Sequence, residues 1–115
     1  MTVKECYEQM NGDYDEVMSR LRKEDRIQKF VLKFLDDKSF ELLCTSLETN
    51  NGEEAFRAAH TLKGVCQNLA FSQLYRSSFE ITEALRNGIS TEASKLLEQV
   101  KADYQLTIDA IKGLQ

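Results

Sequence analysis

Residues 51–70 read NGEEAFRAAHTLKGVCQNLA, and this stretch decides the fold class. Its apolar residues recur every three or four positions, which is the spacing of one face of an α-helix. Asn51 and Glu54 form a helix-capping pattern at the start of the stretch. We therefore predict a long amphipathic helix from Asn51 to about Ala70. Its buried stripe comprises Ala55, Ala59, Leu62, Val65, Cys66 and Leu69.

The segments on both sides of this helix repeat helical periods and are separated by short polar breaks. Asp13 with Glu16, Ser39, and Ser90 are residue types that commonly cap the start of a helix. Asn87 and Gly88 are typical of a helix end. The sequence predicts further helices at 13–21, 27–35, 39–47, 74–87 and 90–111.

Short connections make consecutive helices antiparallel. The sequence therefore predicts an all-α fold, an up-and-down antiparallel four-helix bundle with an additional short N-terminal helix, in a single domain over residues 1–115. The tight link between 27–35 and 39–47 predicts that these two helices are neighbours. Four aromatic residues on the apolar stripes are expected in the core: Phe30, Phe34, Phe40 and Tyr104.

Charge and composition exclude several classes of function. The net charge is −4 and no basic stripe is present, so the footprint of a nucleic-acid-binding protein is missing. The longest apolar stretch, 30–35, is interrupted by Lys33 and is too short to cross a bilayer. Cys6, Cys44 and Cys66 are odd in number and widely spaced, which indicates ordinary thiols. We expect a soluble, cytoplasmic, monomeric protein that binds neither nucleic acid nor membranes.

The chain's only histidine, His60, lies on the outer side of the predicted 51–70 helix. At about 100° per residue, His60 is about 160° from Leu62, which is the middle of the buried stripe. By the same geometry, Gly64 lies about 40° from His60, and Lys63 lies about 60° from it. The imidazole should therefore face outward, with a cation and a glycine beside it.

These residue types suit phosphoryl transfer. A neutral imidazole has a nitrogen lone pair that can attack phosphorus, and an ammonium group can neutralise part of the transferred charge. Glycine inside a helix costs about 1 kcal/mol relative to alanine, so Gly64 needs a compensating role, such as leaving room for a phosphoryl group. Gln67 could hydrogen-bond the ring or the phosphate. Phe56 lies on the same face and could belong to a docking patch or to the edge of the core.

The run Ala59-His60-Thr61-Leu62-Lys63-Gly64 resembles the signature of the histidine-containing phosphotransfer (HPt) domain family, alanine-His-x-Leu-Lys-Gly. The resemblance is strongest over 59–69 and extends more loosely over 13–88. Small residues often follow the glycine in that family, whereas Val65 and Cys66 stand here. A frequent glycine at the helix end is replaced by Ala70.

The resemblance implies a helical bundle whose histidine accepts a phosphoryl group from a receiver-domain aspartate and passes it on. It makes His60 the phosphoacceptor, Lys63 the phosphate-stabilising cation and Gly64 the clearance for the partner. The implied partners are a response-regulator receiver domain, a hybrid histidine kinase, or both. Since the receiver supplies the metal ion, we expect no cofactor or metal in this chain and no independent catalytic activity.

Two other functions remain open from the sequence. The first is a protein-binding adapter of the same fold in which His60 is never phosphorylated. The second is a small helical enzyme that uses His60 as a general base and would need a concave pocket around it. A di-iron site is excluded, because Arg57 takes the glutamate position of the Glu-x-x-His motif and Cys66 lies about 120° around the helix from His60.

Overall fold

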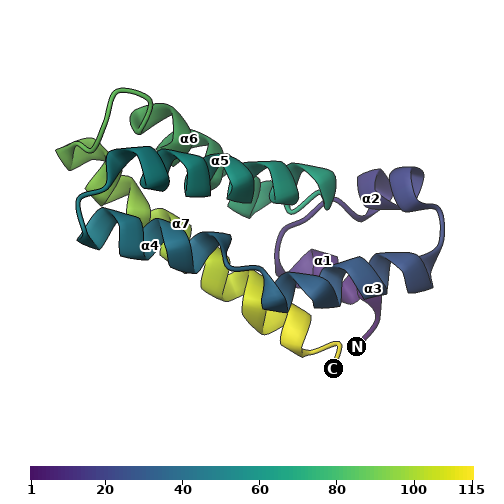
Figure 1. Cartoon of the computed structure of the whole chain (residues 1–115). Coiled ribbons are helices and arrows are strands. Elements are labelled where there is room, and N and C mark those ends of the chain that lie inside the picture. Colours follow the sequence, from purple (N-terminus) through teal and green to yellow (C-terminus); the bar gives the residue numbers. More distant parts are fainter.

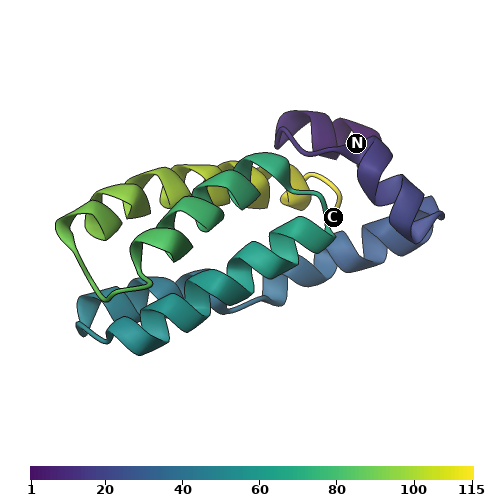
Figure 2. The ribbon, with the colours of Figure 1, turned by 90° about the horizontal axis from the view of Figure 1, so that it is seen from above.

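The computed structural model describes residues 1–115 and contains helices and loops without any β-strand (Figure 1). Four helices, α4 to α7, form an antiparallel bundle, and the three preceding helices pack at one end of it (Figures 1 and 2). The predicted all-α bundle is confirmed. The elements are α1 Val3–Gln9, α2 Tyr14–Leu21, α3 Glu24–Lys33, the 3-10 turn η1 Phe34–Asp36, α4 Ser39–Glu48, α5 Gly52–Asn68, α6 Ser72–Ala84 and α7 Thr91–Lys112.

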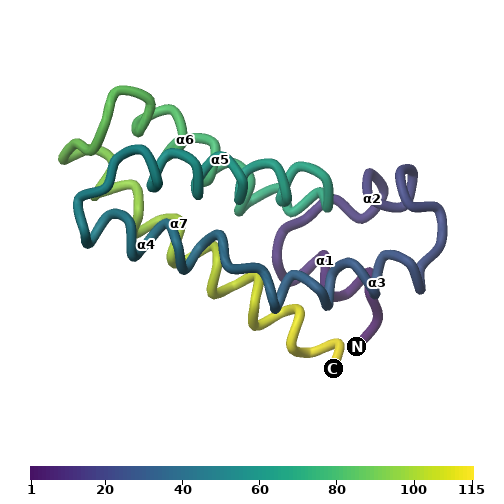
Figure 3. Tube along the Cα trace, viewed as in Figure 1, coloured from purple at the N-terminus to yellow at the C-terminus, as the bar shows by residue number.

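Within the bundle, α5 lies between α4 and α6, and α6 packs in turn against α7. A smaller contact between α4 and α7 closes the bundle on its other side. The chain trace shows short turns between α4, α5 and α6, which reverse the direction of the chain each time (Figure 3). One long side of α5 is therefore left uncovered. None of the helices is both long and apolar enough to cross a bilayer.

Side-chain caps fix three of the predicted helix starts. Asp13 accepts a hydrogen bond from the Glu16 backbone N–H at 3.0 Å, Asn51 from that of Glu54 at 3.2 Å and Ser90 from that of Ala93 at 3.1 Å. The predicted cap at Ser39 is wrong. Ser39 is the first residue of α4, and its N–H donates to the Asp37 carboxylate at 2.8 Å. The side chain that accepts a backbone hydrogen bond at the start of α4 is therefore that of Asp37 and not that of Ser39.

The helix α1 was not among the predicted helices, although its signals are present in the sequence. Thr2 and Glu5 form a reciprocal capping box at its start. Three of its side chains and that of its C-cap residue are buried at helical spacing: Val3, Cys6, Tyr7 and Met10. A capping box followed by this 3, 4, 7 spacing is sufficient to predict a helix.

The prediction that 27–35 and 39–47 pack as neighbours is wrong. The two helices run nearly in line, with η1 between them, and α3 packs on α1 and α2 beyond the end of α5 (Figure 1). The core position predicted for Phe30 is wrong for the same reason. The short helices α1 and α2 cover only part of α3 there, and Phe30 stays 40% exposed.

The other predicted core aromatics connect the bundle to the N-terminal helices. Phe34 is buried, with its ring 5.2 Å from that of Phe71, and Phe71 lies 5.8 Å from Tyr7. Phe40 and Tyr104 are half-buried at the edge of the core, where they stack with ring centroids 4.1 Å apart. Phe34 also lies 6.0 Å from Tyr104, so the aromatic rings link α1, η1, the start of α6, α4 and α7.

The three cysteines are free thiols, as predicted. Cys6 and Cys66 are buried, and Cys44 is half-buried. Burial raises the pKa of the Cys6 thiol to about 11 and raises the pKa of Cys66 further. A thiol with a raised pKa has little thiolate at neutral pH, so these two cysteines act as small apolar side chains.

Candidate functional site

The helix α5 presents the predicted site residues because its opposite side is fully occupied by packing. Its buried face consists mainly of small residues, which allow the neighbouring helices to approach closely. The imidazole of His60 is exposed, as the helical geometry predicts. The buried residues of α5 are Ala55, Ala58, Ala59, Leu62 and Cys66.

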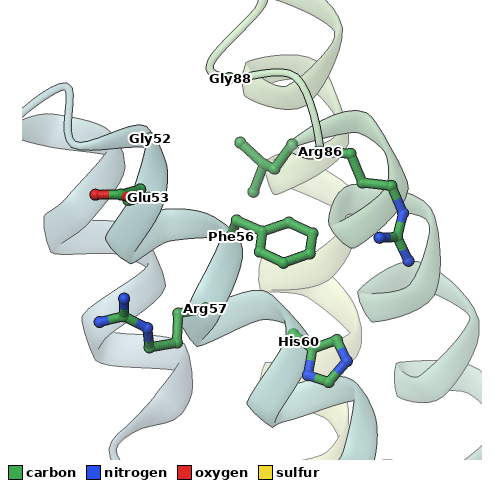
Figure 4. A pocket seen from close by; sticks show the side chains of 8 residues that line it. Gly52, Glu53, Phe56, Arg57, His60, Arg86 and Gly88 are labelled. Atoms are coloured by element: carbon green, nitrogen blue, oxygen red, sulfur yellow. The ribbon is translucent and has the colours of Figure 1, made fainter.

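Phe56 lies one turn before His60 on the same side of α5. The two ring centroids are 6.0 Å apart, with an angle of 32° between the ring planes. Phe56 is half-buried, so it is both at the edge of the core and accessible from outside. Figure 4 shows its ring with His60 one turn along the helix and Arg86 beside it.

Lys63 lies one turn after His60, and its side chain reaches toward α6. Its Nζ is 5.7 Å from the centroid of the Phe79 ring, which is within the range of a cation–π interaction. None of the ion pairs in the structure involves Lys63. The ammonium group therefore has no carboxylate to hold it.

Gly64 opens a gap in the surface beside His60. A Cβ atom added at Gly64 would meet no atom within 4 Å outside the local helix backbone. The absence of a side chain is therefore not required by packing inside the domain. Gln67, one turn further, is exposed and lies on the same outer side.

A shallow depression of about 620 Å³ lies between the first half of α5 and the turn that follows α6 (Figure 4). His60 stands at one end of it. Phe56 and Arg86 also line the depression, and the guanidinium carbon of Arg86 lies 5.4 Å from the centroid of the Phe56 ring. The lining residues are Gly52, Glu53, Phe56, Arg57, His60, Leu85, Arg86 and Gly88.

The two arginines of this depression are paired with acidic residues on their own helical turns. Arg57 pairs with Glu54, and Arg86 pairs with Glu83 at 2.8 Å. Glu53 is the only carboxylate in the lining, and it is seven residues before His60, about 10 Å along the helix axis. Nowhere in the chain do three His, Cys, Asp or Glu side chains converge as a metal site would need.

The sequence-based reasoning missed Phe79 and Arg86, which both come from the α6 side. Phe79 is 43% exposed. It falls off the stripe that α6 buries, and an aromatic residue off the stripe is a signal that could have been noticed. Nothing in the sequence shows that Arg86 covers Phe56, because that contact depends on how α5 and α6 pack.

The C-terminal end of α5 is held by groups from the first 20 residues. The Tyr7 hydroxyl donates to the Leu69 carbonyl at 2.7 Å, and the Asp13 N–H donates to the Ala70 carbonyl at 2.9 Å. The Arg20 guanidinium donates to the Gln67 and Asn68 carbonyls. Carbonyls at a helix end lack partners within the helix, so these donors stabilise the end of the site helix.

This arrangement explains how alanine is accommodated at position 70. Ala70 has a left-handed backbone with φ of 57°, which glycine adopts more readily. The strain amounts to about 1 kcal/mol. The donors from Tyr7 and Asp13, on either side of the bend, offset this strain.

We predict that Tyr7→Phe lowers the free energy of unfolding by about 1 kcal/mol, because it leaves the buried Leu69 carbonyl without its donor. Urea unfolding followed by circular dichroism measures this change. Tyr75→Phe is the matched control, since the Tyr75 side chain is only half-buried. Equal effects of the two substitutions would argue against a specific role for the Tyr7 hydroxyl.

Comparison with known proteins gives one match. The family model described as "Hpt domain" matches residues 34–110, which is more than half of the chain and covers α4, α5, α6 and all but the last two residues of α7. No curated protein and no solved structure matches the chain. The matched region contains His60 and every other residue of the candidate site, whereas α1, α2 and α3 precede it.

Proposed function

We propose that this chain, which belongs to the Hpt domain family, carries a phosphoryl group on His60. The family consists of phosphotransfer carriers in two-component signalling, which interact with receiver domains and histidine kinases. In our proposal, His60 accepts the group from a receiver-domain aspartate and passes it to another aspartate. The observation that supports this proposal best is the exposed imidazole with Lys63 and Gly64 on the same open side of α5.

The proposed reaction is a direct displacement at phosphorus. The lone pair of the unprotonated imidazole nitrogen attacks the phosphorus atom, and a nitrogen–phosphorus bond forms. The phosphorus–oxygen bond to the aspartate breaks, and its electron pair returns to the carboxylate. The second ring nitrogen keeps its proton. The reverse reaction, with another aspartate as acceptor, unloads the carrier.

The neighbours of His60 have separate proposed roles. Lys63 neutralises part of the phosphoryl charge, since an ammonium group near developing negative charge stabilises it. Gly64 provides clearance for the phosphoryl group and for the partner's loops. Phe56 provides apolar contact for the partner, and Gln67 provides a hydrogen-bonding group one turn further.

The general-base alternative has less support from the site. A depression is present beside His60, but the imidazole is exposed at its end. A general base is usually oriented by a second group, and the only carboxylate in the lining lies about 10 Å along the helix. The site therefore fits a partner surface better than a substrate pocket.

Transfer from phosphorylated receiver domains tests the proposal. We would load a panel of receiver domains from the source organism with labelled phosphate and mix each one with the chain. We expect the label to move to the chain from at least one receiver, and the bond to be labile in acid and stable in alkali, as a phosphoramidate is. The adapter alternative instead predicts binding without movement of the label.

A further inference from the structure

Two contacts between a cation and an aromatic ring cross from α5 to the α6 side in opposite directions. Phe56 of α5 lies under the Arg86 guanidinium, and Phe79 of α6 lies under the Lys63 ammonium. His60 lies between Phe56 and Lys63 along α5. The proposed phosphate-stabilising cation is thus in contact with an aromatic ring while His60 is unmodified.

Nothing else in the structure competes for the Lys63 ammonium. Lys63 has no ion pair, and Phe79 offers an exposed ring face at 5.7 Å. Phe79 is 43% exposed, so burial in the core does not account for a phenylalanine there. An unmodified imidazole carries no negative charge that would attract the ammonium away from the ring.

We propose that Phe79 is a positioning residue that holds the Lys63 ammonium over α6 until His60 carries a phosphoryl group. This inference rests on the proposed function. The phosphoryl group bears formal negative charge, which attracts a cation more strongly than the quadrupole of a ring does. Lys63 then leaves Phe79 and moves to the phosphoryl group. The ring contact lowers the free energy of the unphosphorylated form only. Transfer of the phosphoryl group away from His60 is therefore more favourable than it would be without Phe79.

The proposal predicts an effect on equilibrium that docking cannot produce. A residue that only touches the partner changes the rates of transfer in both directions and leaves the equilibrium between the free proteins unchanged. A contact that exists only in the unphosphorylated form changes that equilibrium. Cation–π contacts at exposed sites correspond to about a two- to fivefold change in an equilibrium constant.

A competition experiment measures this equilibrium. The native chain and Phe79→Leu are mixed in equal amounts with a catalytic amount of a phosphorylated receiver that loads His60. Intact-mass spectrometry at neutral pH then gives the share of phosphoryl group on each. We expect about two- to fivefold more on Phe79→Leu. Phe30→Leu is the matched control, because it makes the same substitution at a similarly exposed phenylalanine on α3 and does not touch the Lys63–Phe79 pair. This variant should share the group equally with the native chain.

The same comparison in a Lys63→Gln background shows whether the effect passes through the lysine. Lys63→Gln and the double variant Lys63→Gln, Phe79→Leu should share the phosphoryl group equally. Equal sharing between the native chain and Phe79→Leu would overturn the proposal. An unequal share of the same size in both backgrounds would also overturn it.

A second measurement needs no receiver. Ring currents should shift the Lys63 Cε protons upfield of those of the other lysines in the native chain, and Phe79→Leu should remove the shift. Phosphorylation with phosphoramidate, which transfers its phosphoryl group to His60 and releases ammonia, should remove it too. A shift that is missing, or that persists after phosphorylation, would contradict the proposal. If neither donor loads His60, the proposed function fails, whereas loading without these changes refutes only the role of Phe79.

Discussion

We expect His60→Gln to take up no phosphoryl group from any receiver, while its fold stays intact. His60 is the only histidine of the chain, so no second imidazole can accept the group. Glutamine keeps polarity and a similar length but has no basic nitrogen lone pair. Because the imidazole is exposed, we expect the free energy of unfolding to change by less than about 0.5 kcal/mol. Transfer of label and urea unfolding measure the two quantities.

Thr61→Gln is the matched control for this substitution. It places the same side chain on the exposed surface of α5, one residue along and about 100° around the helix. Phosphoryl uptake should therefore persist in Thr61→Gln and be lost in His60→Gln. If His60→Gln still takes up label in a bond that is labile in acid and stable in alkali, His60 is excluded as the acceptor. Receiver binding should remain in both variants, which separates loss of chemistry from loss of docking.

The bundle could be predicted because each helix carries its own local signals. The 51–70 stretch has a capping residue, one apolar stripe and a polar outer side, and the structure places α5 at Gly52–Asn68. Such signals depend only on residues within a few turns of one another. The missed α1 had the same kind of signals, with Thr2 and Glu5 at its start. The sequence therefore contains the local information that specifies α1 as well.

The errors in the fold have a different cause. Whether 27–35 and 39–47 lie side by side or in line depends on the backbone angles of the few residues that join them, and helical periodicity does not contain these angles. The exposure of Phe30 follows from the same in-line arrangement, since α3 extends beyond the end of α5. Apolar spacing predicts which side of a helix is buried only where another element covers that side.

In the candidate site, too, the residues within one helix could be predicted from the sequence, whereas the contacts between helices could not. His60, Lys63 and Gly64 share one helix, so the angle between consecutive residues was enough to place them on one side. Phe79 and Arg86 join the site from across the α5–α6 boundary, where rotation of one helix against the other decides the contacts. The hydrogen bond from the Tyr7 hydroxyl to the Leu69 carbonyl joins residues 62 positions apart, so local sequence patterns could not predict it either.

The second large effect is expected for Gly64→Gln, which should slow transfer from a receiver by about a hundredfold. A misplacement of about 1 Å between reacting groups can cause a loss of this size. The glutamine side chain would project from a position about 40° from His60, where the surface is now open. The free energy of unfolding should rise by up to about 1 kcal/mol, since glutamine favours a helix more than glycine does. Transfer kinetics and urea unfolding measure the two changes.

Gly64→Ala separates bulk from helix propensity, because it gains the same kind of helix stability with a single added carbon that meets no other side chain. Its transfer rate should stay much closer to that of the native chain. Unchanged transfer in Gly64→Gln would refute the clearance role. Phosphoramidate distinguishes what the gap accommodates, because this small donor brings no partner loops. If Gly64→Gln loads normally from phosphoramidate and slowly from a receiver, the open backbone at position 64 serves the partner protein, and if both reactions slow, it serves the phosphoryl group itself.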